Sequence, residues 1–598
     1  MLAKDDLLDR VVERVKELLP EDRAPQAEEF VRRYYSWIPR EDLADRSPVD
    51  LYGAAVSHFG FAHQRSPGEA KVRVYNPRFE EHGWQSTHTV LEIVTDDMPF
   101  LVDSLRMEVN NRGYAIHLML HPIMKVRRDD EGKLQEILPL DSEDEVSESV
   151  IHTEVDRQTE PDVLEELRAG IERILTQVRA SVEDWPTMLE KVGDLVSDYD
   201  ENPPPIEDED LAEGRAFFEW ISDNNFTFLG YREYELSTEN GEDSLVAKAD
   251  TGLGILRQTG DKPVSRSFSR LPPEVRRRAR TPNLLILTKA NTRSIIHRPS
   301  YMDYVGVKKF DANGEVAGER RFLGLYTFTA YSMSAFDIPI VRRKARYVLE
   351  RAGFPEGSHN EKDLVEILET YPRDELFQIS REELFDIAMG ILHLQERQRV
   401  RLFVRRDTYG RFFSCLVFVP RDRYNTEIRQ RMQKILLSAF GGASVEFNVR
   451  LSESVLARLH FTIYTGPDGA PDYDENEVEG RIAEAARSWT DDLYGALVEG
   501  FGEEVGTEHF RKYRDAFPPG YRAGFLARTA VSDIRSIEAL SSEDDIGMSL
   551  YHPLEEDDDF LGFKLFREGE QISLSSVLPL LEDMGVQVVD ERPHRIEA

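Results

Sequence analysis

One short module occurs twice in this chain and limits how the chain can fold. Residues 89–120, TVLEIVTDDMPFLVDSLRMEVNNRGYAIHLML, have the pattern of an apolar strand, an acidic turn with a proline, an amphipathic helix, a glycine and a second apolar strand. The same order starts again at Phe560, with a strand to Phe566, a helix over Ser573–Met584 and a strand over Val586–Glu591. A single strand–helix–strand unit leaves one sheet edge and half of its apolar face uncovered. Because the second copy ends there, we expect the chain to be part of a longer protein.

The first copy lies within a larger domain. It is followed by a strand, SVIHTEVDR, and by an amphipathic helix predicted over Pro161–Val182. The order strand, helix, strand, strand, helix is a split βαβ pattern, in which both helices cover one side of a compact sheet. Later in the chain two hairpins flank a helix and are followed by one long helix predicted over Glu475–Gly500, which indicates a second domain of the same type.

The chain between these two domains has a different pattern. The helix LAEGRAFFEWISDNN leads into an antiparallel meander with a DANGE hairpin turn, which suggests a PAS-like domain. The stretch Ser197–Gly214 combines prolines with acidic residues, and we interpret it as a linker because it cannot bury enough surface to fold alone.

We therefore predict an α+β multidomain protein with repeated sandwiches, an antiparallel meander domain and helical connecting segments. The predicted segments are an N-terminal helical segment (1–70), a first α/β sandwich (71–195), an acidic linker (196–212), a PAS-like domain (213–335), a helical connector (336–397), a second sandwich (398–470), a helical motif (471–545) and an incomplete third sandwich (546–598).

Composition excludes several classes of function. The net charge is −37, from 112 acidic and 75 basic residues, so the electrostatic binding of nucleic acid is not expected. The single cysteine, Cys415, allows no intrachain disulfide or cysteine metal cluster, and its apolar strand RFFSCLVFVP predicts a buried thiol. No apolar run reaches the ~18 residues that a membrane helix needs, and the charged N-terminus lacks a signal region. We expect a cytoplasmic protein without a membrane partner.

Catalytic motifs are not found. The sequence has no phosphate-binding P-loop or GxGxxG fingerprint, and the pair Gly252 and Gly254 fits turns of a meander better than a dinucleotide loop. His117 and His121 share a predicted strand face, but a spacing of four places them about 13 Å apart, too far for a shared metal. We therefore predict no catalytic, cofactor-binding or metal-ligating residue in this chain.

The turn of the first module is the candidate binding site, formed by Asp96, Asp97, Met98, Pro99 and Phe100. Free amides at the start of the following helix can hold the carboxylate of a small ligand. In the alternative interpretation the turn is structural, because the two aspartates cap those amides and repel an anion, and the proline favours the first helical turn.

The same residues carry a resemblance to a known family of domains. VTDDMPFLVDSLRMEVNNRGYAIHLMLHPI resembles the ACT domain, a βαββαβ regulatory module that senses amino acids in metabolic enzymes. The typical ACT turn has the pattern D.PG.L, and Phe100 stands here in place of the glycine that lets a ligand approach the backbone. By this resemblance the three sandwiches are ACT-like domains, and an amino-acid effector is a possible ligand.

The resemblance extends along the chain. The motifs HTVLEIVTDDMPFLVDSL, FTFLGYREYEL, RLFVRRDTYGRFFSCLVFVP, SWTDDLYGAL and FPPGYRAGF are together similar to the N-terminal region of the large bacterial NAD-specific glutamate dehydrogenases. The resemblance implies ACT-like and PAS-like domains before a C-terminal catalytic domain, a homotetramer, and oxidation of L-glutamate to 2-oxoglutarate and ammonia with reduction of NAD. The NAD site and the catalytic residues are then expected in the C-terminal domain, outside this chain.

Three functions remain open at this point. The first is a regulatory and assembly region of such a dehydrogenase, catalytically inactive on its own. The second is a stand-alone amino-acid sensor built from ACT-like modules. The third is an enzyme of unrecognised type within the meander domain.

Overall fold

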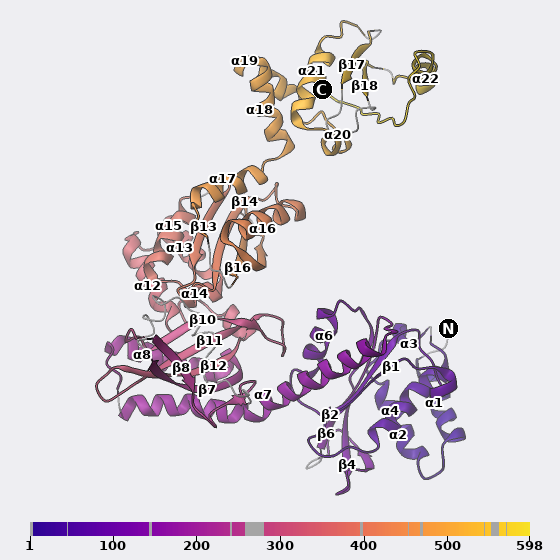
Figure 1. Cartoon of the computed structure of the whole chain (residues 1–598), viewed down its shortest axis with the longest axis vertical. Coiled ribbons are helices and arrows are strands. Elements are labelled where there is room, and N and C mark those ends of the chain that lie inside the picture. Colours follow the sequence, from indigo (N-terminus) through magenta and orange to yellow (C-terminus); the bar gives the residue numbers. More distant parts are fainter. Residues whose placement is uncertain are drawn as a thin grey trace. The chain divides into compact units, whose positions relative to one another are not determined.

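The computed structural model of the chain is shown in Figure 1. It describes residues 4–44, 46–142, 146–201, 203–239, 242–257, 280–394, 397, 399–452, 454–466, 471–542, 545–551, 561–569 and 571–598. The chain forms two compact units, the first comprising Met1–His393 with Asp407–Arg411 and the second Leu394–Arg406 with Phe412–Ala598. The architecture mixes helices with several antiparallel sheets, as an α+β multidomain protein requires.

The first unit begins with a layer of four helices. In the first of them Leu7, Val11 and Val15 recur at helical spacing and are buried, and the chain leaves this helix at Pro20. The fourth begins at Pro48, after Ser47, whose Oγ accepts a hydrogen bond from the Asp50 amide at 3.1 Å. The helices are α1 (Lys4–Leu18), α2 (Ala24–Tyr34), α3 (Arg40–Ala44) and α4 (Pro48–Ala62).

These helices pack on the sheet of the first ACT-like domain. Its strand order is β1-β2-β6-β4-β5, with β3 also paired to β6. Every pairing is antiparallel. The elements are β1 (Lys71–Tyr75), α5 (Phe79–His82), β2 (Thr89–Asp96), α6 (Leu101–Asn111), β3 (Ile116–Leu120), β4 (Ile123–Arg128), β5 (Leu134–Leu138), β6 (Val146–Val155) and α7 (Pro161–Glu201).

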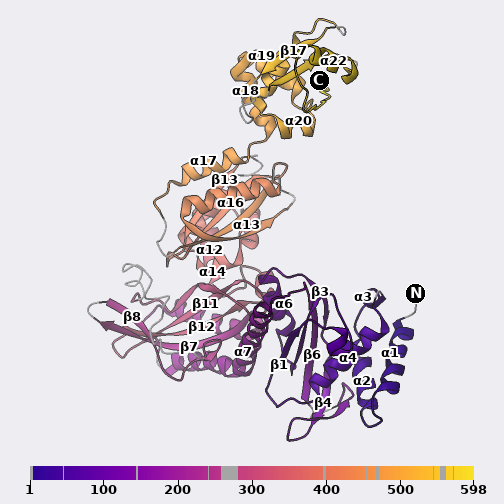
Figure 2. The same cartoon turned by 45° about the vertical axis from the view of Figure 1, so that its right-hand side comes forward.

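The two faces of this sheet are covered by different helices. On one face Leu91 and Ile93 of β2 share an apolar core with α6 and α7, so the prediction that both helices lie on one side is confirmed. On the other face Val94 and Val150 pack against α1, α2 and α4. Figure 2 shows this sequence of layers, with α7 on one side of the sheet and α1, α2 and α4 on the other.

Helix α7 is longer than the sequence predicted. It continues past Val182 to Glu201, into the stretch interpreted as a linker, and α8 (Asp208–Trp220) begins only a few residues later. The acidic residues do not end the helix, because Val192, Leu195 and Tyr199 continue its apolar stripe and are buried. Helix α7 contacts β1 and α6 in its first part and β7 and β9 farther along, so it connects two domains of the first unit (Figure 1).

The predicted meander is an antiparallel sheet of order β10-β11-β12-β7-β8, with β9 paired to β7. It differs from a simple meander, because the last strand, β12, pairs with the first, β7. The expected hairpin lies between β11 and β12, where the turn at Asp311 is closed by the amides of Asn313 and Glu315. The elements are η1 (Ile221–Asn225), β7 (Phe226–Glu239), β8 (Glu242–Ala247), β9 (Leu253–Gly254), β10 (Leu285–Arg293), β11 (Tyr301–Phe310) and β12 (Val316–Tyr326).

The predicted helical connector is helical. Its last helix begins with a capping box of Ser380 and Glu383, and both hydrogen bonds of the box are present. The helices are α11 (Phe328–Ser332), α12 (Val341–Ala352), α13 (His359–Thr370), α14 (Arg373–Gln378) and α15 (Arg381–Leu392).

The second unit contains the second sandwich. Its sheet has the order β13-β14-β16-β15, and Cys415 on β14 is fully buried, as predicted. The core between this sheet and its two helices includes Met432, Leu436 and Ile482. The elements are β13 (Arg401–Arg406), β14 (Phe412–Pro420), α16 (Thr426–Phe440), β15 (Gly442–Arg450), β16 (Leu456–Thr465) and α17 (Glu475–Ala485).

The long helix predicted over Glu475–Gly500 is two helices. The first ends at Ala485, and a capping box of Ser488 and Asp491 starts the next, because these side chains satisfy the amides of a new helix start. The sequence signal for this break is SWTD, in which the serine precedes an aspartate by three residues. The following helices are α18 (Trp489–Phe501), α19 (Glu503–Tyr513), α20 (Pro519–Gly524) and α21 (Ala527–Glu538).

The C-terminal module differs from the predicted strand–helix–strand unit. Strand β18 (Gly562–Phe566) pairs with β17 (Gly547–Tyr551), and α22 (Leu574–Asp583) follows. The predicted strand over Val586–Glu591 is wrong, because those residues are in no strand, with Val586 and Val589 exposed. Phe560, where the predicted strand begins, lies outside the described residues. Among the described helices, none is both long and apolar enough to cross a membrane.

Candidate functional site

The predicted turn joins β2 to α6 without the predicted caps. Helix α6 begins at Leu101, its N-cap residue is Phe100, and no side chain accepts a hydrogen bond there. The interpretation of Asp96 and Asp97 as caps is therefore wrong, and Pro99 precedes the helix instead of opening it. Phe100 has φ of +74°, a left-handed conformation that glycine adopts without strain. The glycine of the ACT pattern would adopt this conformation more readily than Phe100 does.

Asp96 is held by arginines instead of by helix amides. Its Oδ1 accepts from Arg65 Nη2 at 2.6 Å and its Oδ2 from Arg179 Nη1 at 2.6 Å. Asp96 stands opposite Glu148 in the β2–β6 register, and Arg65 bonds both carboxylates. Arg128 also donates to Glu148. Burial alone would raise the pKa of Asp96, but the hydrogen bonds from Arg179 and Arg65 outweigh it and lower that pKa.

Asp97 belongs to a separate row of hydrogen bonds. Its Oδ1 accepts from Ser149 Oγ at 2.7 Å, and Ser149 Oγ lies 2.8 Å from His121 Nε2. Because the serine hydroxyl donates its hydrogen to the carboxylate, the serine oxygen accepts from His121 Nε2, which places the imidazole proton on Nε2. Burial lowers the pKa of His121, so the ring is neutral at neutral pH. This row of hydrogen bonds, from Asp97 through Ser149 to His121, connects the turn to the end of β3.

The remaining turn residues face a loop of the meander domain. The ring of Phe100 lies 5.1 Å from that of His297, centroid to centroid, and His297 also has a left-handed backbone with φ of +70°. The His297 amide donates to Ser104 Oγ on α6 at 3.1 Å. Met98 packs against the core beside α6, whereas Pro99 is exposed. The turn is thus covered on one side by the loop that carries His297.

A cavity of about 290 Å³ lies at the outer edge of β3. It is bounded by β3 on one side, by the α2–α3 segment on another, and by Arg106 of α6. His117 and His121 both line it, and His121 joins it to the row of hydrogen bonds from Asp97. Trp37 lines it as well and is 86% exposed. Arg106 is exposed and makes no ion pair within the part of the chain that the structure describes.

His117 has contacts of its own, distinct from those of His121. Its Nε2 lies 2.7 Å from Asp156 Oδ1, and its ring stacks on His88 with centroids 4.1 Å apart. The two histidines of β3 therefore have separate hydrogen-bond partners.

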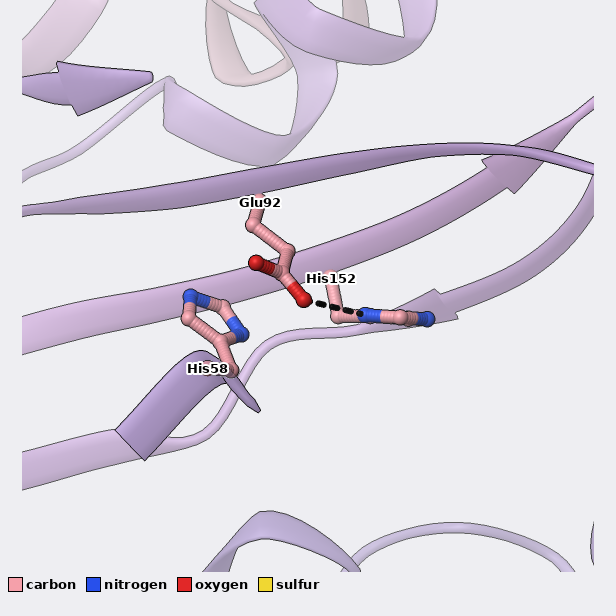
Figure 3. Close-up of side chains that lie close together, drawn as sticks. All are labelled: His58, Glu92 and His152. Atoms are coloured by element: carbon pink, nitrogen blue, oxygen red, sulfur yellow. Dashed lines mark ion pairs between the residues drawn. The ribbon is translucent and has the colours of Figure 1, made fainter. Parts of the chain in front are cut away.

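A second polar site lies under the N-terminal helices. In the sheet register Arg73 of β1 stands opposite Glu92 of β2, and Glu92 stands opposite His152 of β6. Cross-strand neighbours on one face touch, so these three side chains form one polar row. His58 of α4 lies over this row (Figure 3). His58, Glu92 and His152 are each at most 1% exposed.

Each member of this site has a further partner. Tyr34 Oη lies 3.0 Å from His58 Nδ1, and Tyr75 Oη donates to Glu92 Oε1 at 3.1 Å. Arg73 Nε donates to Glu92 Oε2 at 3.0 Å. His152 Nε2 lies 3.4 Å from Glu154 Oε1, and Arg46 holds Glu154 with bonds of 2.5 and 2.9 Å.

The charge states follow from these contacts. Burial lowers the pKa of His58 to about 4. Burial would lower that of His152 too, but Glu154 and Glu92 outweigh it and raise its pKa. Burial would raise the pKa of the Glu92 and Glu154 carboxyls. Their positively charged partners outweigh burial and lower the pKa of Glu92 to about 2 and that of Glu154 to about 2. At neutral pH the site thus holds two carboxylates and two guanidiniums around the imidazoles.

The sequence-based prediction missed this site. Its three central residues come from one helix and two strands, far apart in the chain, so no spacing motif connects them. One signal was present: Glu92 in VLEIV and His152 in VIHTEV are ionisable residues inside otherwise apolar strands. Ionisable residues are rarely buried unless they are paired, so each of these two residues indicates a polar partner nearby.

Comparison with protein families matches five domain models along the chain. Residues 30–171 match the glutamate dehydrogenase ACT1 domain, 401–490 the ACT2 domain and 545–598 the ACT3 domain of the same enzyme. Residues 338–397 match helical motif 1 and residues 496–540 match helical motif 2.

Curated relatives agree with these matches. The NAD-specific glutamate dehydrogenase of Halomonas elongata is 43% identical over 599 residues, which is 100% of this chain and 37% of the relative. The chain belongs to the large NAD-specific glutamate dehydrogenase family. The family member of Pseudomonas aeruginosa is 38% identical over 99% of this chain and 37% of its own length. That of Mycobacterium tuberculosis is 28% identical over 94% of this chain and 33% of its own length.

The chain therefore spans somewhat more than a third of the length of these glutamate dehydrogenases. The ACT1 match contains both sites described above, because residues 30–171 include the turn, β3, and the His58, Glu92 and His152 side chains. The resemblance of the turn region to an ACT domain is confirmed.

Proposed function

We propose that this chain is the N-terminal regulatory and assembly region of an NAD-dependent glutamate dehydrogenase. In the reaction, L-glutamate, NAD and water give 2-oxoglutarate, ammonia and NADH. The observation that carries the proposal is that three ACT domains and two helical motifs of this enzyme family follow one another along the chain. The enzyme activity is taken from the names of the relatives, and this chain matches only 37% of the length of each of those proteins.

The proposal assigns the chemistry to a C-terminal catalytic domain, which also binds NAD and is the direct partner of this region. The test compares the 598-residue chain with the full-length enzyme in an assay of glutamate-dependent NADH formation. We expect activity only for the full-length enzyme. Glutamate-dependent NADH formation by the 598-residue chain alone would refute the division of roles.

An amino-acid effector is proposed to bind in the cavity beside β3. The guanidinium of Arg106 offers two parallel donors to a carboxylate, and Asp42, which also lines the cavity, offers an acceptor to an ammonium group. His121 would report occupancy to the turn through Ser149 and Asp97. An effector shifts activity only if it binds one state of the enzyme better than the other.

Calorimetry tests this effector site. The chain is titrated with a panel of amino acids, and Arg106→Gln is expected to remove the binding that wild type shows. Arg528→Gln is the matched control, because Arg528 is 80% exposed on α21 in the second unit. If both variants bound the amino acid as wild type does, the cavity would not be the effector site. In that case the turn at Asp97 is tested next, with Asp97→Ala and Pro99→Gly.

The remaining parts of the proposal concern architecture and assembly. We propose a PAS-like domain for the sheet β10-β11-β12-β7-β8, whose strand pairs are antiparallel. We also propose a homotetramer located in the cytoplasm. Light scattering of the full-length enzyme measures the assembly, and a monomer would contradict it. If the coding sequence ended at Ala598 without a dehydrogenase domain, the alternative of a stand-alone amino-acid sensor would replace the proposal.

A further inference from the structure

Two carboxylates face the two nitrogens of one buried imidazole. His152 is 1% exposed, and its Nε2 lies 3.4 Å from Glu154 Oε1. Its Nδ1 lies 3.9 Å from Glu92 Oε1 (Figure 3). A carboxylate has no hydrogen to donate, so a neutral ring would point the lone pair of one nitrogen at one of these carboxylates. We propose that His152 is an imidazolium cation at neutral pH, and that loss of its proton at alkaline pH loosens the N-terminal helices from the ACT1 sheet.

The two carboxylates favour the proton on His152. Burial lowers the pKa of a histidine, but the hydrogen bonds and charges of Glu154 and Glu92 outweigh burial here and raise the pKa of His152. His58 provides a contrast within the same site. It is also fully buried, but the partner of its Nδ1 is the hydroxyl of Tyr34, and burial lowers its pKa to about 4. His58 is therefore neutral at neutral pH, whereas the ring between the carboxylates is charged.

His152 is the group of this site that titrates near neutral pH. Both neighbouring carboxyls have a pKa lowered to about 2, and burial raises the pKa of both tyrosine hydroxyls above its ordinary value. The guanidiniums keep their protons throughout. A rise from pH 6.5 to pH 9 therefore changes the charge of His152 and of no other group around it. These groups are Arg73 and Tyr75 of β1, Glu92 of β2, Glu154 of β6, Tyr34 of α2, His58 of α4, and Arg46 between α3 and α4.

The charge of His152 lies between two layers of the domain. Arg46, which belongs to the helical layer, holds Glu154 with bonds of 2.5 and 2.9 Å. Glu154 is therefore shared by Arg46 and by His152, its neighbour on β6. When His152 loses its proton, one carboxylate faces a lone pair in a site without water, which is costly because neither group has another way to be solvated. Opening the layers relieves this cost, so the helices leave the sheet more readily.

The helical layer also forms one wall of the cavity beside β3. Tyr34, Trp37 and Ile38 line the cavity from α2 and the segment after it, and the ring of Tyr34 lies 6.0 Å from that of His152, centroid to centroid. Loosening of this layer would change the shape of the wall, so the proton on His152 would regulate effector binding. This consequence rests on the proposed function, whereas the charge of His152 and the docking of the helices are measured without any effector.

Rising pH weakens the contact between the layers. The pKa of His152 is raised in the folded chain above its ordinary value of 6.5. The stabilising contribution of the proton is therefore complete below about pH 6.5 and is lost as the pH rises through the folded pKa. Between these two values, each pH unit increases the population of the open state by up to about tenfold.

Nuclear magnetic resonance of the complete 598-residue chain, labelled with ¹⁵N in histidine, measures the charge of the ring. An imidazolium has two similar nitrogen shifts, whereas a neutral imidazole has two very different shifts, because only one of its nitrogens carries a hydrogen. We expect the imidazolium pattern for His152 at pH 7 and a titration midpoint above pH 6.5. His152→Gln assigns the signal by its loss. If this variant does not fold, contacts with the ring of Trp84, 6.3 Å away between centroids, identify the signal.

Native-state hydrogen exchange measures the docking of the helices. After correction for the intrinsic exchange rate, the opening of α2 and α4 in wild type should increase by up to about tenfold per pH unit above pH 6.5, and His152→Gln should lack this increase. His117→Gln is the matched control, because His117 is 39% exposed on β3, and this variant should keep the wild-type dependence.

Arg46→Gln gives a change that misfolding does not produce. It removes a positive charge beside Glu154, so the titration midpoint of His152 should move to higher pH. Loss of the folded structure would move the midpoint in the opposite direction, towards the value of an unfolded chain.

Each result decides the proposal. An imidazolium at pH 7, together with pH-dependent opening of α2 and α4 that His152→Gln removes, supports it. A neutral His152 ring at pH 7 overturns it, as does opening that is independent of pH in wild type or equally dependent on pH in His152→Gln. A midpoint that stays constant or falls in folded Arg46→Gln also contradicts it. None of these measurements uses an effector or the enzyme assay, so their failure is distinct from failure of the proposed function.

Discussion

Arg65 offers the strongest test of how the first ACT domain is held together. Its guanidinium is 1% exposed and donates to Glu148 at 2.6 and 3.0 Å and to Asp96 at 2.6 Å. Replacing it with methionine keeps the volume and leaves two carboxylates opposite each other in the β2–β6 register. The loss of one partner from a buried ion pair costs about 3–5 kcal/mol. Because Arg128 and Arg179 remain beside the two carboxylates, we expect the lower limit, about 3 kcal/mol.

Native-state hydrogen exchange is the suitable assay, because the chain has several domains and a single unfolding free energy is not defined. A loss of about 3 kcal/mol makes exchange of the β2 and β6 amides about a hundredfold faster. Amides of β14 and β16, in the second unit, should not change. The matched control is Arg127→Met, since Arg127 pairs with Glu136 on the surface.

Two outcomes would refute this reasoning. If Arg65→Met exchanged at the wild-type rate in β2 and β6, the ion-pair network would contribute no net stability. If Arg127→Met accelerated exchange equally, the effect would come from the general loss of positive charge in an acidic protein and not from the buried position of Arg65.

Four further predictions follow from single sites. Lowering the pH below about 4 should accelerate β2 exchange in wild type but less so in Asp96→Asn. The pKa of Asp96 is lower in the folded protein than in the unfolded chain. Its contribution to stability is therefore present above the unfolded pKa and is lost as the pH falls through the folded pKa. Phe100→Gly should be more stable than Phe100→Ala by about 1 kcal/mol, measured by native-state exchange of the α6 amides, since both remove the ring and only glycine accepts φ of +74° without strain; equal exchange rates would contradict this. Cys415 should react with a thiol reagent only in denaturant, and fast reaction in buffer would show that β14 opens. Ser488→Ala should destabilise α18 by about 1 kcal/mol, measured by exchange of its first amides.

The elements of the fold were largely predictable from local patterns. The apolar run of β2 and the helical spacing in α6 depend on side chains a few residues apart, so the sequence shows them directly. The errors arose where partners are distant. Asp96 was expected to cap the next helix, but Arg65 and Arg179, 31 and 83 residues away, bond its carboxylate instead. Helix α7 was predicted to end at Val182 but continues to Glu201, because apolar side chains such as Tyr199 are buried along its later turns.

The candidate sites show the same limit. The turn of residues 96–100 was located from the strand–turn–helix pattern of the repeated module, and Phe100, which stands where the ACT pattern has glycine, has φ of +74°. The polar row could not be located, because it requires the strand register. Period two predicts that Glu92 and His152 each face one side of a sheet, but only the pairing of β2 with β6 places them opposite each other.

Strand β6 is the element that relates the turn to the buried polar row. Its side chains alternate, so Glu148 and His152 face the N-terminal helices, whereas Ser149 lies on the other face and holds Asp97. A shift of one residue in the β2–β6 register would exchange these two sets and would bury the carboxylate of Glu148 among the apolar side chains of α6 and α7. Arg65 opposes such a shift, because it bonds Glu148 and Asp96 only when the two stand opposite each other. The charges of this domain therefore specify the register that the apolar pattern alone leaves less well defined.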